Sequence, residues 1–109
     1  MAKTRKARND RNHVIYCVTC IVTGAQYVGL TVATGGVKKA LHVRMQKHAE
    51  RARNENKDWG LCKALRDHGA ESFVYGALFV IRGKKKAHAA EMELIRAFNP
   101  ELNTFKAAA

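Results

Sequence analysis

Hydrophobic and polar residues alternate in two short runs near the start of the chain. The first run extends from His13 to Val22 and the second from Tyr27 to Thr31, with the turn sequence TGAQ between them. A period of two is typical of strands with one buried face, and a glycine-containing turn between two such runs is typical of a hairpin. The pattern therefore predicts a β-hairpin with a tyrosine, Tyr16 or Tyr27, on each strand.

A helical period replaces this alternation after the sequence ATGG, which breaks the strand pattern. The apolar positions at helical spacing are Val37, Leu41, Met45 and Ala52. They predict a helix over residues 37–54. A second, shorter helix is expected in the sequence DWGLCKALRDHG, with Asp58 as its N-cap, Trp59 in the core and Gly69 at its end.

The second half of the chain repeats the change from strand to helix. The uncharged run SFVYGALFVI, residues 72–81, predicts a buried strand bounded by Gly83, with Phe73 and Tyr75 in the interior. The sequence KKKAHAAEMELIRAF, residues 84–98, predicts a third helix that Asn99-Pro100 ends. The order β-β-α-α-β-α predicts an α+β fold, a small three-stranded antiparallel sheet flanked by helices.

The length of 109 residues, of which 47% are hydrophobic, is sufficient for one domain with its own core. We assign residues 13–106 to this domain, residues 1–12 to a flexible basic arm and residues 107–109 to a tail. No apolar run reaches membrane-spanning length, and the first residues lack the apolar segment of a signal peptide. These features, with three cysteines and no sign of secretion, favour a cytoplasmic protein with reduced thiols.

Cys17 and Cys20 form a CxxC sequence without a second pair that could complete a zinc site. On a strand, positions three apart point to opposite faces of the sheet. We therefore interpret both cysteines as small packing residues. Four histidines, at positions 13, 42, 68 and 88, are interpreted as surface or packing residues as well.

Positive charge is the strongest compositional feature. Twenty Lys and Arg residues against nine Asp and Glu residues give a formal net charge of +11, which favours an acidic polymer, above all nucleic acid, as partner. Solubility alone is the competing explanation, but the charges cluster in the first twelve residues and in RGKKK at 82–86. The expected DNA contacts are Lys3, Arg5, Lys6, Arg8, Arg11, Lys38, Lys39, Lys84, Lys85 and Lys86.

A carboxylate falls on the apolar side of the third helix. At 100° per residue, Leu94, Ile95 and Phe98 define an apolar arc with Glu91 in its middle, whereas Glu93 points away. A carboxylate on a core face costs several kcal/mol or so unless something compensates it. The compensation can come from an arginine, from hydrogen bonds or from a metal ion.

The first helix carries a comparable anomaly. Arg44 and His48 are four residues apart and share the face of Val37 and Leu41. Several polar residues at core positions usually mark a site rather than a core. An arginine, a carboxylate and several proton carriers form a suitable set for the hydrolysis of a phosphodiester.

These residues resemble the GIY-YIG nuclease family. The motifs that carry the resemblance are, in chain order, VIY at 14–16, YVG at 27–29, RxxxH at 44–48, GAESF at 69–73 and ExxLI at 91–95, followed by Pro100 and LN at 102–103. Together they span residues 13–105. The chain departs from the family pattern at Val14, where the family has glycine, and in the long loop TVATGGVK before Arg44.

The resemblance implies a metal-dependent nuclease site. Glu91 would bind one divalent cation, Mg²⁺ or Mn²⁺, and Asn103 would brace the helix that carries it. Tyr16 would be the general base on the attacking water, with its pKa lowered by neighbours.

The neighbours expected around Tyr16 have roles of their own. Arg44 would neutralise charge on the phosphoryl oxygens. His48 would orient a tyrosine hydroxyl or relay its proton. Tyr27 would reach the same site from the paired strand.

The resulting hypothesis is a small DNA endonuclease that requires a divalent metal. The alternative is a non-catalytic nucleic-acid-binding module on the same fold. A basic assembly protein would explain the charge but not Glu91. The chain has no room for the separate DNA-recognition domain of larger family members, so a homodimer or a protein partner that supplies specificity stays open.

Overall fold

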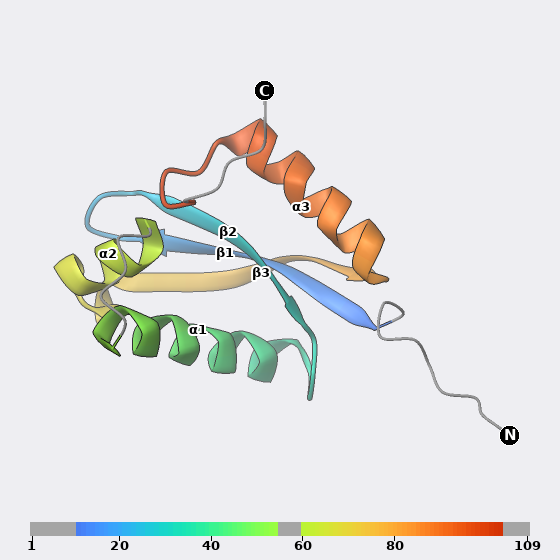
Figure 1. Cartoon of the computed structure of the whole chain (residues 1–109), viewed down its shortest axis with the longest axis horizontal. Helices are drawn as coiled ribbons and strands as arrows, with labels where there is room; N and C mark the ends of the chain where they lie inside the picture. Colours follow the sequence, from blue (N-terminus) through green and yellow to red (C-terminus); the bar gives the residue numbers. More distant parts are fainter. Residues whose placement is uncertain (1–10, 55–59, 104–109) are drawn as a thin grey trace, which may run out of the picture.

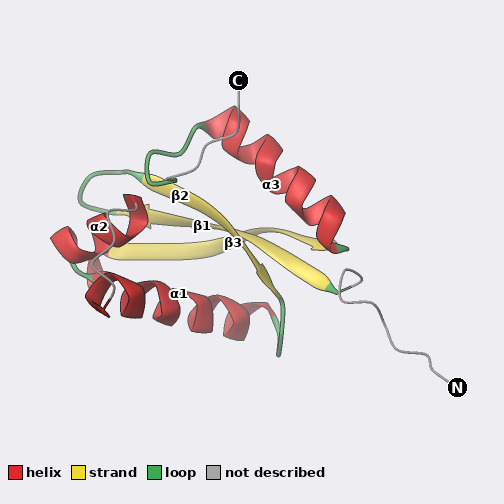
Figure 2. Cartoon of the chain, in the orientation of Figure 1, coloured by secondary structure: helices red, strands yellow, loops and turns green. Residues whose placement is uncertain are grey.

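Three antiparallel strands and three helices make up the fold (Figures 1 and 2). The computed structural model describes residues 11–54 and 60–103. The elements in chain order are β1 (Asn12–Cys20), β2 (Gln26–Val32), α1 (Val37–Asn54), α2 (Gly60–His68), the short 3₁₀ turn Ala70–Ser72, β3 (Phe73–Arg82) and α3 (Lys84–Phe98). The sheet has the order β2-β1-β3. The predicted α+β class and element order are confirmed.

The helices lie on opposite faces of the sheet (Figure 1). Side chains alternate along β1, so Val14, Tyr16, Val18 and Cys20 form one core with residues of α1 and α2. Ile15 forms a second core with Val28 of β2 and Ile95 of α3. The central strand therefore carries buried residues on both faces. It supports α1 on one face and α3 on the other.

The hairpin register brings the two tyrosines to the same face. Tyr16 lies opposite Gly29, and Val18 lies opposite Tyr27. Residues opposite each other in an antiparallel pair point to the same side, which is the α1 side. β1 starts one residue earlier than predicted, so Asn12 belongs to the sheet and not to the arm. It also ends two residues earlier, because the chain turns after Cys20 and bonds the Gly24 N–H to its carbonyl.

The helix ends agree with the sequence pattern where they are described. α1 has the predicted bounds, and α3 ends at Phe98 because Asn99 takes a left-handed conformation with φ of 48° before Pro100. Gly69, with φ of 85°, ends α2 as expected. The predicted start of this helix at Asp58 and the packing of Trp59 lie outside the described residues, as do residues 1–10 and the tail.

The prediction that the third strand is buried is wrong. Phe73 is in the core, but the rest of β3 is largely exposed, including Tyr75 with 40% of its surface accessible. A continuous apolar run is typical of a strand covered on both faces. In this fold β3 is instead an edge strand, because β1 takes the central place and the helices pack mainly over β1 and β2.

Candidate functional site

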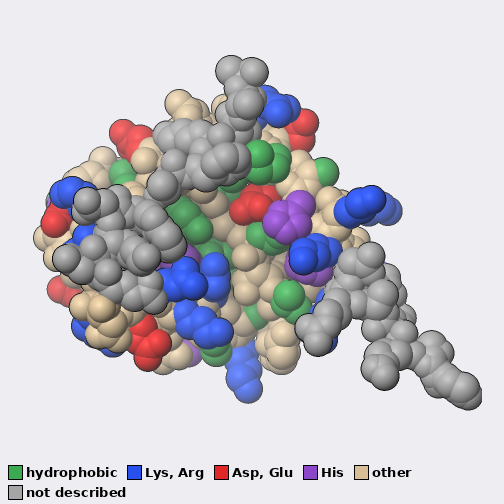
Figure 3. Space-filling model, viewed as in Figure 1, with side chains coloured by type: hydrophobic (Ala, Val, Ile, Leu, Met, Phe, Trp, Pro, Cys, Tyr) green, Lys and Arg blue, Asp and Glu red, His purple; other side chains and the backbone are tan. Residues whose placement is uncertain are grey.

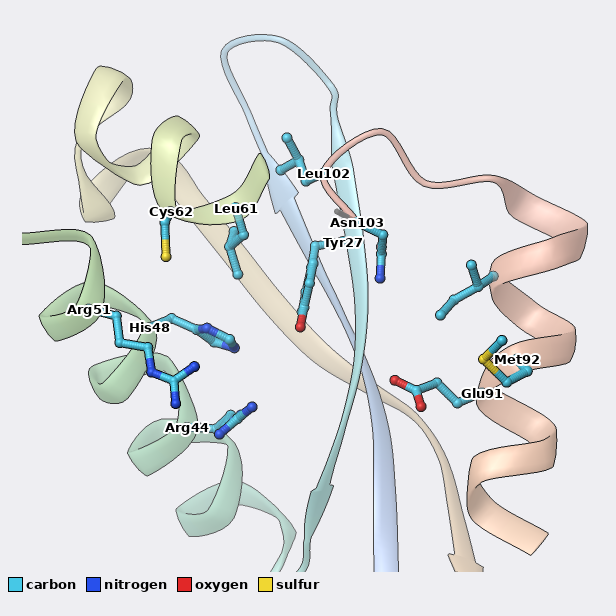
Figure 4. A pocket seen from close by; sticks show the side chains of 11 residues that line it. Tyr27, Arg44, His48, Arg51, Leu61, Cys62, Glu91, Met92, Leu102 and Asn103 are labelled. Atoms are coloured by element: carbon cyan, nitrogen blue, oxygen red, sulfur yellow. The ribbon is translucent and has the colours of Figure 1, made fainter. Parts of the chain in front are cut away.

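A cleft of about 280 Å³ lies at the edge of β2, between α1 on one face of the sheet and α3 on the other. Figure 4 shows Arg44 and His48 reaching toward it from α1, Tyr27 from β2 and Glu91 from α3. Asn103, from the segment after α3, also lines the cleft. The fold thus brings together five of the six residues expected at a catalytic site.

Tyr16, the sixth, lies behind the wall of this cleft. It is fully buried, and its hydroxyl lies 2.9 Å from Nε2 of His48 and accepts a hydrogen bond from Nε of Arg44 at 3.3 Å. Since Arg44 donates to the phenolic oxygen, we assign the phenolic proton to the bond with His48. Tyr16 therefore ties Arg44 and His48 of α1 to the central strand.

The surroundings of Tyr16 and His48 keep both side chains uncharged. Burial raises the pKa of the Tyr16 hydroxyl far above its ordinary value; the neighbouring Tyr27 adds to this, and Arg44 acts against it. Burial and the positive charges of Arg44 and Arg51 lower the pKa of His48 to about 4. At neutral pH the proton therefore stays on Tyr16, and His48 is an uncharged acceptor. The expected lowering of the Tyr16 pKa is not found in the free protein.

Tyr27 is the tyrosine that faces the cleft. Its ring lies edge-on to His48, with the ring centres 5.5 Å apart, and 6.2 Å from the ring centre of Tyr16. Burial raises the pKa of the Tyr27 hydroxyl, Arg44 opposes this and Glu91 adds to it. The opposing effects of Arg44 and Glu91 on one hydroxyl agree with their positions on either side of Tyr27 in Figure 4.

Glu91 supplies a carboxylate to the α3 side of the cleft. Only 17% of its side chain is exposed, and its carboxylate lies 3.6 Å from Nδ1 of His88. Burial raises the pKa of the carboxyl group, whereas His88 and Arg44 act to lower it. No three His, Cys, Asp or Glu side chains in residues 11–54 and 60–103 gather as a metal cluster. Glu91 is the carboxylate among the side chains that line the cleft.

Asn103 holds the end of the domain on the edge of β2. Its side-chain amide accepts a hydrogen bond from the Val28 N–H and donates one to the Val28 carbonyl, each at 2.9 Å. The N–H of Leu102 adds a bond to the Gln26 carbonyl. Asn103 thereby fixes the segment that follows α3 to the edge of β2. The expected role of Asn103 in bracing α3 stays a prediction.

Basic side chains border the cleft on both sides. Lys39 and Lys47 line a neighbouring hollow with Arg44, and Lys84 lines another with Arg44 and Glu91. Figure 3 shows Lys and Arg side chains gathered around this part of the surface. Among the other expected DNA contacts, Arg11, Lys38, Lys85 and Lys86 are exposed, and Lys3, Arg5, Lys6 and Arg8 lie outside the described residues.

Two basic residues at the cleft were not singled out in the sequence. Lys47 and Arg51 lie three and seven positions after Arg44 on α1, a spacing that places them on the same side of the helix. This helical spacing is the signal that could have identified them.

No protein-family model, curated protein or solved structure matches this chain. Among the described helices, none is both long enough and apolar enough to cross a membrane. Function therefore has to be argued from the geometry and chemistry of the cleft.

Proposed function

We propose that the protein is a metal-dependent endonuclease that hydrolyses DNA phosphodiester bonds, as its resemblance to the GIY-YIG family implies. The observation that carries the proposal is the convergence of Arg44, Tyr27 and Glu91 from three separate elements on one cleft with a basic rim. A guanidinium group, a hydroxyl and a carboxylate form a suitable set for phosphodiester hydrolysis.

The rim and the arginine account for substrate binding. Lys39, Lys47 and Lys84 are placed to neutralise phosphates on either side of the cleft. Arg44 points into the cleft itself, where its guanidinium would stabilise the charge that builds up on the phosphoryl oxygens. The Tyr16 hydroxyl holds Arg44 in this position.

Glu91 fits a hexacoordinate, largely hydrated metal ion. Mg²⁺ is commonly bound by one or two carboxylates and keeps several waters, and the cleft of about 280 Å³ has space for them. Structural zinc would need four protein ligands. When bound, a cation such as Mg²⁺ or Mn²⁺ would polarise the scissile phosphate and acidify a bound water.

The burial of Tyr16 changes the roles of the two tyrosines. The hydroxyl of Tyr27 faces the cleft, so we assign to it the contact with the attacking water. Tyr16 lies out of reach of water and has a raised pKa, so we assign it, with His48, to the positioning of Arg44 and of the Tyr27 ring. This replaces the hypothesis that Tyr16 is the general base.

The alternative function is a nucleic-acid-binding module without catalysis. It is favoured by the basic rim, which needs no metal, together with the lack of a three-ligand cluster in the described part of the chain. This module would bind duplexes through the same lysines and leave them intact.

Incubation of the purified protein with supercoiled plasmid and Mg²⁺ or Mn²⁺, with and without EDTA, separates the two functions. We expect nicked and linear products that EDTA suppresses, and loss of cleavage in Glu91→Gln but not in Glu93→Gln, an exposed glutamate on the same helix. Binding without cleavage under all metal conditions would support the module, and parental cleavage by Glu91→Gln would refute the metal assignment.

A further inference from the structure

The outer edge of β3 has no partner strand within residues 11–54 and 60–103. β1 pairs with its inner edge along the whole strand, from Phe73 opposite Cys20 to Arg82 opposite Asn12. A free edge presents backbone N–H and C=O groups that can pair with another chain. Edge strands usually carry charges or proline as protection, but residues 73–81 contain neither.

Both faces of this edge expose large apolar side chains. By register, Val74 and Phe79 lie on the α3 side and Tyr75 and Val80 on the α1 side. Between 40% and 54% of the surface of each of these residues is accessible, and the same holds for Leu78 at the register shift. The strand is thus apolar above and below as well as open at its edge.

The size of this surface is consistent with a protein interface. An aromatic side chain can bury 150–250 Å², so the exposed halves of Tyr75 and Phe79 offer about 100 Å² each. With the three aliphatic residues, the patch comes to about 400 Å², near the largest that a monomer usually exposes. The backbone of a ten-residue strand brings the total toward the roughly 600 Å² per partner of small specific interfaces.

The charges at the two ends of β3 indicate which partner fits. Glu71 precedes the strand, and Arg82 and Lys84 follow its uncharged part. If two copies of β3 pair antiparallel around a two-fold axis, the acidic end of each strand lies next to the basic end of the other. A second copy therefore offers a matching apolar edge with opposite charges at its ends, although the chain carries a net charge of +11. We propose that the protein forms a homodimer through antiparallel pairing of β3 with β3.

This dimer would leave both clefts open. The two sheets would join in the order β2-β1-β3-β3-β1-β2, and a two-fold axis perpendicular to the sheet keeps both α1 helices on the same side. Each cleft lies at the far edge of β2, so five strand spacings, about 24 Å, would separate the two β2 strands. The dimer does not rest on the proposed nuclease function, because no residue of its interface lines the cleft itself; Lys84, at the end of the interface, also belongs to the basic rim.

Sedimentation velocity over a range of protein concentrations, without DNA, tests the proposal. We expect the parent to sediment as a dimer that dissociates on dilution. Phe79→Lys should raise the dimer dissociation constant about tenfold or more, because it puts a charge into the joined apolar face. The control Phe98→Lys adds the same charge at a phenylalanine that is 60% exposed at the end of α3, and should change the constant less than about twofold.

Three further variants keep the test decisive. Val74→Lys places a charge elsewhere on the same strand and should act like Phe79→Lys, which guards against one variant that folds poorly. Glu71→Lys should weaken the dimer by like-charge repulsion, and the added change Lys84→Glu should restore it. A parent that is monomeric at every concentration would overturn the proposal and leave the strand to a different partner. A dimer that tolerates both lysine substitutions would place the interface elsewhere and overturn it too.

Discussion

The ring of Tyr16 lies directly over the backbone of Gly29, its partner across the β1–β2 hairpin. A Cβ at position 29 would come within 2.5 Å of both Cζ and Oη of Tyr16. Glycine is therefore required here for space, and this space lets the phenol reach His48 and Arg44. The glycine of the YVG motif and the tyrosine of the VIY motif are parts of one contact.

Gly29→Ala should accordingly displace Tyr16 and destabilise the fold by about 1–3 kcal/mol, the usual cost of overpacking. Urea unfolding measures this change. Gly76→Ala on β3 is the matched control, because a Cβ there would have no atom within 4 Å, and it should be neutral or slightly stabilising. Equal stability of the two variants would contradict the position of Tyr16.

Replacing each tyrosine in turn by phenylalanine distinguishes the proposed role of Tyr16, which positions Arg44, from that of Tyr27, which contacts the attacking water. Tyr16→Phe leaves the buried His48 Nε2 without its partner and removes an acceptor from Arg44, so we expect a loss of about 1–3 kcal/mol in unfolding free energy. Tyr27→Phe should change stability less. Both should reduce the single-turnover cleavage rate by about two orders of magnitude. Full activity of Tyr16→Phe would remove it from the mechanism, and full activity of Tyr27→Phe would refute its assignment to the water.

The lowered pKa of His48 predicts a loss of stability in acid. The ring is neutral in the folded protein down to about pH 4, whereas in the unfolded chain it binds a proton below about pH 6.5. Between these values the unfolded state holds more protons, so stability falls as the pH falls, by about 3 kcal/mol in total. Urea unfolding at a series of pH values should show this slope in the parent.

His48→Gln should remove most of the slope, because glutamine can keep a polar contact to Tyr16 without titrating. The control His42→Gln changes an exposed histidine on the same helix and should keep the slope. The same slope in His48→Gln and the parent would show that other groups cause it.

Glu91→Gln should stabilise the metal-free protein at neutral pH. Burial raises the pKa of this carboxyl group, so its ionised form costs the folded state free energy at every pH above the raised pKa, and the penalty fades as the pH falls toward the unfolded value. Urea unfolding at pH 7 in EDTA measures the gain. Glu93→Gln, which removes only an exposed 3.4 Å contact with Arg96, should bring no such gain. A loss of stability in Glu91→Gln would indicate that the carboxylate is a structural ion-pair partner of Arg44 or His88.

Binding through phosphates predicts a steep dependence of affinity on salt. Lys39→Ala with Lys47→Ala should flatten the slope of log K against log salt by about two units, at 0.9 per phosphate, and equally for unrelated duplexes. Salt titrations of parent and variant on several duplexes measure this. Lys63→Ala, which affects a lysine of α2 paired with Asp67 at 3.1 Å, should leave the slope unchanged. An unchanged slope in the double variant would place the DNA on another surface.

Much of the fold could be predicted because the signals are local. Alternating residues predicted the hairpin, and helical spacing predicted the bounds of α1 and α3. Both signals are local because side-chain burial follows the backbone period of each element. The positions of Arg44, His48 and Glu91 on the inner faces of their helices follow from the same periodicity. The sequence by itself therefore determined that these three side chains turn inward, although Phe98, predicted on the same apolar arc as Glu91, is 60% exposed because it lies in the last turn of α3.

Only the tertiary structure decided what those side chains meet. An apolar run such as residues 73–81 is more typical of a covered strand, but its place in the sheet depends on which strand lies between the other two. The depth of Tyr16 and the exposure of Tyr27 likewise depend on how α1 docks against the hairpin, where Tyr16 meets His48, 32 residues later in the sequence. Strand order and helix docking are long-range choices made by the total burial of the core, and no local period records them.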